Sequence, residues 1–122
     1  MTGIEEIAAE RKRQVESERW SSKHDDQHTN KSLALAAALY AAPIPLFQKD
    51  DLARGGVSFI DPWPWWLKDH DPQSRAAPVP NWDKRQKHSY RRRLAIAGAL
   101  LAAEIDRLDR AEAKAARKSA DQ

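Results

Sequence analysis

Apolar residues recur along the chain in three stretches with helical spacing, and each stretch predicts a helix. In the stretch from about residue 3 to residue 20, apolar side chains fall on one face at steps of three and four. Residues 31–42 are apolar on nearly all sides, which is typical of a buried helix. A longer stripe runs through about residues 83–117. The pattern therefore predicts an all-α fold, a compact three-helix domain that comprises residues 1–122.

Residues at the helix ends support these boundaries. Thr2 and Glu5 have the Thr-x-x-Glu spacing of a capping box at the start of the first helix. Thr29 or Asn30 can cap the second helix, and Pro43 can end it, because proline lacks the amide hydrogen that a helix interior needs.

The connection between the second and third helices, residues 43–82, holds all seven prolines and four of the five tryptophans. We expect it to be a long Pro/Trp-rich loop that the packing of large rings keeps ordered. Within it, residues 48–54 favour a short helical turn that ends at two glycines. Residues 57–60 favour a short strand without an evident partner.

Composition excludes several classes of protein. The absence of cysteine excludes disulfides, thiolate zinc sites and thiol nucleophiles. The longest apolar run, residues 94–103, is half of the roughly 20 residues that a transmembrane helix needs. The sequence is acidic from its fifth residue, so we do not expect a secretory signal at this end. We therefore expect a protein of the reducing cytoplasm that has no membrane partner.

The net charge of +3 conceals a local basic patch, since residues 84–93 hold six of the 21 lysines and arginines. On one continuous helix, Lys84, His88 and Arg91 or Arg92 would share a face. Cations at a helix start oppose the helix dipole, whereas a phosphate there would be attracted to guanidinium groups and helix amides alike. A solvated basic surface remains the alternative. Nucleic acid is an unlikely partner, because the patch is short and no DNA-binding motif is present.

A second polar cluster, the run from His24 to His28, holds two imidazoles and two carboxylates. Such groups can read a ligand or hold a divalent metal. They can equally cap the following helix and bond to a neighbouring one. Asp25 and Asp26 are the carboxylates of this cluster.

Trp63, Trp65 and Trp66, with Lys68 close by, form an aromatic and cationic cluster. Indole rings stack on nucleobases, and a nearby cation suits a phosphate. The alternative is that the rings cover a small core.

Glu104 lies on or beside the apolar stripe of the last helix, where a buried carboxylate needs a partner. His24, His28 or an arginine of the first helix can supply that partner. Along the first helix, Glu6 and Glu10 form a repulsive pair four residues apart.

Six motifs occur in order along most of residues 10–110. They are Glu10 to Gln14, Glu18-x-Trp20, His24-Asp-Asp-x-His28, the alanine-rich Leu33 to Ala42, Trp63-Pro-Trp65 with Trp66, and the run from Arg92 to Arg110. Together they resemble a family of small phage and prophage proteins, from which this chain departs in the insert at residues 43–60. Phage accessory proteins of this size often counter host defence. One class of them, the nucleotide sponges, binds cyclic or ADP-ribose-derived signals without cleaving them, and this chain is similar to that class in type.

The function predicted from these observations is the sequestration of a nucleotide-derived immune signal, with no catalytic residue and no cofactor. Trp65 or Trp66 would stack on the base, and Lys84, Arg91 and Arg92 would hold phosphate. The residues expected at the ligand are His24, Asp25, Asp26, His28, Trp63, Trp65, Trp66, Lys68, Lys84, His88, Arg91, Arg92 and Glu104.

An alternative function is that of an all-α nucleotide pyrophosphohydrolase, in which a magnesium ion activates water. Its metal ligands would be Asp25, Asp26, Glu104 and Asp109. The paired acidic spacings of those enzymes are absent from this sequence.

The apolar second helix and the wide stripe of the last helix predict a homodimer or a dimer of dimers. The residues expected to be shared between core and interface are Leu33, Leu35, Leu39, Leu100 and Leu101. Two-fold pairing would bring two Trp-rich loops and two basic helix starts into one composite site. The rival is a monomer in which residues 43–60 cover the second helix.

Overall fold

Helices dominate the computed structural model, which describes residues 1–17, 22–26, 31–60, 62–64, 85 and 87–121. The helices are α1 (Gly3–Glu16), α2 (Ser22–Asp26), α3 (Ser32–Ala41) and α6 (Tyr90–Ala120). In this part of the chain the only sheet is a two-stranded hairpin of β1 (Gln48–Asp51) and β2 (Val57–Ile60). The expected helix-dominated class is confirmed.

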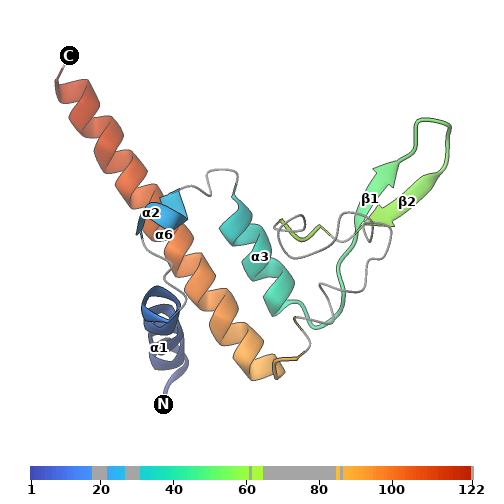
Figure 1. Ribbon diagram of the computed structural model, residues 1–122, viewed down its shortest axis with the longest axis horizontal. Helices are drawn as coiled ribbons and strands as arrows, with labels where there is room; N and C mark the ends of the chain where they lie inside the picture. Colours follow the sequence, from blue (N-terminus) through green and yellow to red (C-terminus); the bar gives the residue numbers. More distant parts are fainter. Residues whose placement is uncertain (18–21, 27–30, 61, 65–84, 86, 122) are drawn as a thin grey trace.

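The long helix α6 is the element on which the other helices pack. α1, α2 and α3 all contact α6, and α1 and α3 lie on different sides of it (Figure 1). The hairpin projects away from the helices on the side of α3 (Figure 1). Within the described residues, no helix is both long and apolar enough to cross a lipid bilayer.

The start of α1 is the predicted capping box. The Thr2 hydroxyl accepts a hydrogen bond from the Glu5 amide at 3.2 Å, and the Glu5 carboxylate accepts one from the Thr2 amide at 3.0 Å. The start of α3 differs from the prediction. Its N-cap is Lys31, in the left-handed conformation with φ 64°, and not Thr29 or Asn30.

The helix expected from residue 83 begins seven residues later, at Tyr90, and continues to Ala120. Ser89 stops the helix from extending further back. Its extended backbone lets its hydroxyl accept a hydrogen bond from the Arg92 amide at 3.1 Å. Before Ser89 the chain turns, and the His88 amide donates to the Arg85 carbonyl at 3.2 Å. His88 therefore does not share a helical face with Arg91 or Arg92, and that prediction is wrong.

The helical turn predicted at residues 48–54 is also wrong, because β1 pairs there with β2. The strands are antiparallel, with Gln48 opposite Ile60 and Asp51 opposite Val57. Gly55 and Gly56 have φ values of 85° and 93°, which residues with a side chain rarely adopt. They close the turn, and residues 57–60 form the predicted strand with β1 as partner. The rest of the predicted Pro/Trp-rich loop, residues 65–82, lies outside the described residues.

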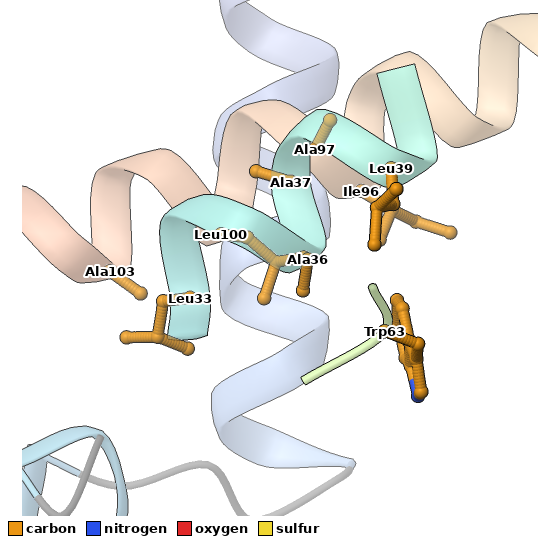
Figure 2. Packing of buried hydrophobic residues seen from close by; sticks show 9 residues of the cluster. All are labelled: Leu33, Ala36, Ala37, Leu39, Trp63, Ile96, Ala97, Leu100 and Ala103. Carbon is orange, nitrogen blue, oxygen red and sulfur yellow. The ribbon is translucent and has the colours of Figure 1, made fainter. Parts of the chain in front are cut away.

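The apolar core lies mainly between α3 and α6, as Figure 2 shows. Its residues are Leu33, Ala36, Ala37, Leu39, Trp63, Ile96, Ala97, Leu100 and Ala103. The alanines let the two helices approach closely, while the leucines fill the space between them. Arg93 adds a polar tie, because its Nη1 donates to the carbonyl of Ala42 at the end of α3, at 3.2 Å.

Candidate functional site

An open groove of about 450 Å³ lies between α1 and the first turn of α6. Its polar lining residues are Glu6, Glu10, Arg13, Ser89, Arg91 and Arg92. Three guanidinium groups and two carboxylates thus meet beside a helix N-terminus. This groove contains two residues that the sequence assigned to phosphate, Arg91 and Arg92.

The cap at Ser89 determines where the arginines lie. Because α6 begins at Tyr90, both Arg91 and Arg92 are in its first turn, where the helix dipole disfavours cations. Carboxylates of α1 offset this cost. Arginines thus compensate the charges of Glu6 and Glu10, which repel each other along the first helix.

Glu10 is the central carboxylate of the groove, and its side chain has no exposed surface. Arg13 donates to it through Nε at 2.9 Å and Nη2 at 2.8 Å, and Nη2 of Arg92 lies 2.5 Å from its Oε2. Burial on its own raises the pKa of Glu10. The hydrogen bond from Arg13 and the charge of Arg92 outweigh burial, so the pKa of Glu10 is lowered. Glu10 therefore stays ionised and joins α1 to α6.

Glu6 forms the outer ion pair of the groove, with Arg91. The hydrogen bond from Arg91 lowers the pKa of Glu6. The side chain of Arg91 is nevertheless 75% exposed, and that of Arg92 is 37% exposed. Both guanidinium groups are thus accessible to a dissolved anion, which would compete with the two glutamates for them.

Asp25 and Asp26, expected at the ligand, instead join α2 to its neighbours. Asp25 is fully buried and pairs with Nη2 of Arg11 at 2.8 Å. Asp26 pairs with Nη2 of Arg110 at 2.7 Å, which attaches α2 to α6. Arginines of neighbouring helices bind both carboxylates. These ion pairs favour the alternative in which the run from His24 to His28 bonds to neighbouring helices.

Glu104 is buried, as the sequence indicated, and its partner is Nε of Arg107, one turn later on α6, at 2.5 Å. The expected partners were His24, His28 or an arginine of the first helix. Asp109 is exposed on α6. In the part of the chain that the structure describes, no three His, Cys, Asp or Glu side chains gather as a metal site. The structure does not bring Asp25, Asp26, Glu104 and Asp109 together as metal ligands.

Trp63 belongs to the core, in agreement with the alternative that tryptophan covers the core. Its ring is 5% exposed and packs edge-to-face on Tyr40, with ring centroids 5.6 Å apart. The guanidinium of Arg85, itself 2% exposed, lies 4.9 Å from the centroid of the Trp63 ring. Trp63 is therefore closed to a stacked base, and neither it nor Arg85 lines the groove.

The remaining predicted ligand residues are not part of the described site. His24 lies on α2, and His88 is exposed in the turn that precedes α6. His28, Trp65, Trp66, Lys68 and Lys84 lie outside the described residues.

Sequence reasoning missed four polar lining residues of the groove: Glu6, Glu10, Arg13 and Ser89. Ser89 carried a recognisable signal, because serine is a favoured N-cap residue. Arg13 carried none, since it is one of several alternating charges on the first helix.

Comparison of the chain with protein-family models, with curated proteins and with solved structures finds no match.

Proposed function

We propose that this chain binds a phosphate-bearing, nucleotide-derived small molecule in the groove between α1 and α6 and sequesters it without cleaving it. The observation that carries the proposal is the convergence of Arg13, Arg91 and Arg92 on one open groove at the N-terminus of a long helix. Guanidinium forks bind phosphate oxygens in pairs, and the helix terminus adds its own attraction for an anion.

The groove volume of about 450 Å³ lies within the range of small-molecule sites. In the proposal, Arg91 and Arg92 hold the phosphate of the ligand. The exposed face of Arg91 receives the ligand first, because Arg92 is more enclosed.

Binding without turnover is favoured by the state of the groove carboxylates. Glu6 and Glu10 are ion-paired, and both have lowered pKa values. A carboxylate that is held ionised by arginines is a weak base and a poor metal ligand, so it is badly suited to activate water. The setting in the proposal is that of a phage anti-defence protein of the bacterial cytoplasm, and rests on the resemblance to small phage and prophage proteins.

Titration calorimetry with a panel of cyclic nucleotides and ADP-ribose derivatives tests the proposal. We expect one of them to bind and to be recovered intact after heat denaturation of the complex. The absence of binding across the panel contradicts the proposal. Magnesium-dependent loss of the ligand contradicts sequestration and favours the pyrophosphohydrolase.

Variants assign the binding to the groove. Arg91→Ala or Arg92→Ala is expected to weaken binding by about tenfold or more, because each removes charged hydrogen bonds worth roughly 1.5–3 kcal/mol. Arg117→Ala makes the same change on an exposed residue at the far end of α6 and serves as the control. Glu6→Gln is expected to tighten binding, since it removes the carboxylate that competes for Arg91. Equal affinities in all four variants would place the ligand elsewhere.

A further inference from the structure

A third face of α6 carries exposed apolar side chains, in addition to the faces that pack on α3 and α1. Its residues, here called the α6 seam, are Tyr90, Leu94, Leu101, Ile105 and Leu108, each between 41% and 59% exposed. They stand apart from the scattered exposed residues of the hairpin, because they form a continuous line on a regular element. Contiguous apolar surface of this kind marks an interface.

The seam cannot be covered by α3 or α1. Residues Ile96, Leu100 and Ala103 point to the core with α3, and Gly98 and Arg92 meet α1. With 3.6 residues per turn, the seam lies on the side of α6 that these two contacts leave open. α6 spans about 46 Å, whereas α3 spans about 15 Å, so among the described residues α3 covers only part of its length.

The spacing of the seam is that of a two-stranded coiled coil. Leu94, Leu101 and Leu108 recur every seven residues, and Ile105 occupies the second core position of one heptad, where the neighbouring heptads have Gly98 and Glu112. The partner is therefore a helix with the same apolar spacing.

We infer that the α6 seam binds the α6 seam of a second copy of this chain, with the two helices antiparallel and the two-fold axis near Leu101. About this axis, Leu101 meets Leu101 of the second copy, and Leu94 meets Leu108 of the second copy. The apolar line is thus complementary to itself, as a two-fold interface requires.

Charge along the seam selects the antiparallel direction. Arg91 flanks its amino end, and Asp109 and Glu112 flank its carboxyl end. Antiparallel helices place Arg91 beside Asp109 and Glu112 of the second copy, and they also align the helix dipoles favourably. Parallel helices would place like charges opposite each other.

This surface differs from the one the sequence predicted. Leu33, Leu39 and Leu100 are buried within the single chain, and only Leu35 and Leu101 of the predicted set remain exposed.

In the antiparallel pair, the anion grooves of the two copies lie apart from each other. Arg91 lies ten residues from the axis, so the two copies of Arg91 would be about 30 Å apart, and each groove would bind its own ligand.

The mass in solution is the first test. Light scattering on the intact chain at tens of micromolar is expected to give twice the chain mass of 13.9 kDa. Leu101→Lys is expected to give the single-chain mass. Leu52→Lys is the matched control, because Leu52 is exposed to 49% against 48% for Leu101 but lies in the turn of the hairpin. A single-chain mass for the unaltered protein overturns the inference, as does a dimer that survives Leu101→Lys.

Cysteine cross-linking tests the direction, since the chain has no cysteine of its own. Under mild oxidation, Leu101→Cys is expected to cross-link to itself. Leu94→Cys is expected to cross-link with Leu108→Cys when the two variants are mixed, and neither is expected to cross-link alone. Self-cross-linking of Leu94→Cys and of Leu108→Cys would show parallel helices and overturn the inferred arrangement. These readouts require no ligand, so they are independent of the groove proposal.

Discussion

Gly98 sets how closely α1 approaches α6. A Cβ added at this position would lie 2.6 Å from Cδ1 and 2.7 Å from Cγ1 of Ile7, closer than carbon atoms pack. Replacing glycine by alanine in a helix stabilises it by about 1 kcal/mol, but overpacking costs about 1–3 kcal/mol. We therefore expect Gly98→Ala to lower the free energy of unfolding by about 1 kcal/mol in urea titrations.

Removal of the clashing side chain provides the control. In an Ile7→Ala background, Gly98→Ala is expected to raise the free energy of unfolding by up to about 1 kcal/mol, because only the gain in helix propensity remains. The same effect in both backgrounds would show that contact with Ile7 does not decide the outcome.

Glu10 links stability to pH. Its pKa in the folded chain is below the ordinary value of 4.5, so the stability that it contributes is present above that value. This stability is lost as pH falls through the pKa of the folded state. We expect Glu10→Gln to lower the free energy of unfolding at neutral pH by roughly 1–3 kcal/mol and to flatten its fall between about pH 5 and about pH 3.

A residual slope is expected in that variant, because the pKa values of Glu5 and Glu6 are lowered too. Urea titrations at a series of pH values measure the slope. A slope that matches that of the unaltered protein would exclude Glu10 as a source of the pH dependence.

Single residues also show what the sequence could predict. The burial of Glu104 follows from its place on an apolar stripe, and the capping box follows from local spacing. The pairing of Glu10 with Arg92 does not follow, because 81 positions separate them and the crossing of α1 with α6 decides the contact. That crossing depends on a glycine that no local pattern singles out.

Among the elements, the hairpin is the one that depends least on the helices. All residues of β1 are exposed, and its turn requires the left-handed backbone of Gly55 and Gly56. We expect Gly55→Ala combined with Gly56→Ala to remove protection of the hairpin amides from hydrogen exchange, while the helical melting temperature stays the same. A matching fall in helix stability would show that the hairpin supports the helices.

The elements also differ in how well local pattern predicts them. α3 was predictable because a helix apolar on all sides must be buried, and proline follows it. β1 was not, because its sequence, Gln-Lys-Asp-Asp, has no alternation and becomes a strand only beside β2. The sequence pattern places the start of α6 too early. The basic run before Ser89 contains good helix formers, and the Ser89 cap is the signal that marks the true start of the helix.

At the scale of the whole molecule, α6 contacts α1, α2 and α3, and its contacts with α1 and α3 differ in chemistry. Its contact with α3 is apolar, whereas its described contact with α1 rests largely on arginine–glutamate pairs around one glycine. The ion-paired side forms the groove, and the seam occupies a third side. Ligand binding and self-association are thus assigned to neighbouring sides of one helix, with Arg91 at the border between them.

Self-association through the α6 seam would make the melting temperature depend on protein concentration. If the second copy covers the α6 seam, unfolding is coupled to dissociation, and the melting temperature rises with protein concentration. A tenfold increase is worth about 1.4 kcal/mol, or about 4 °C for a dimer of this size. Thermal melts followed by circular dichroism at several concentrations measure the shift. We expect it in the unaltered chain and in Leu52→Lys but not in Leu101→Lys. A melting temperature independent of concentration in all three proteins would mean that α6 keeps its third side exposed to water.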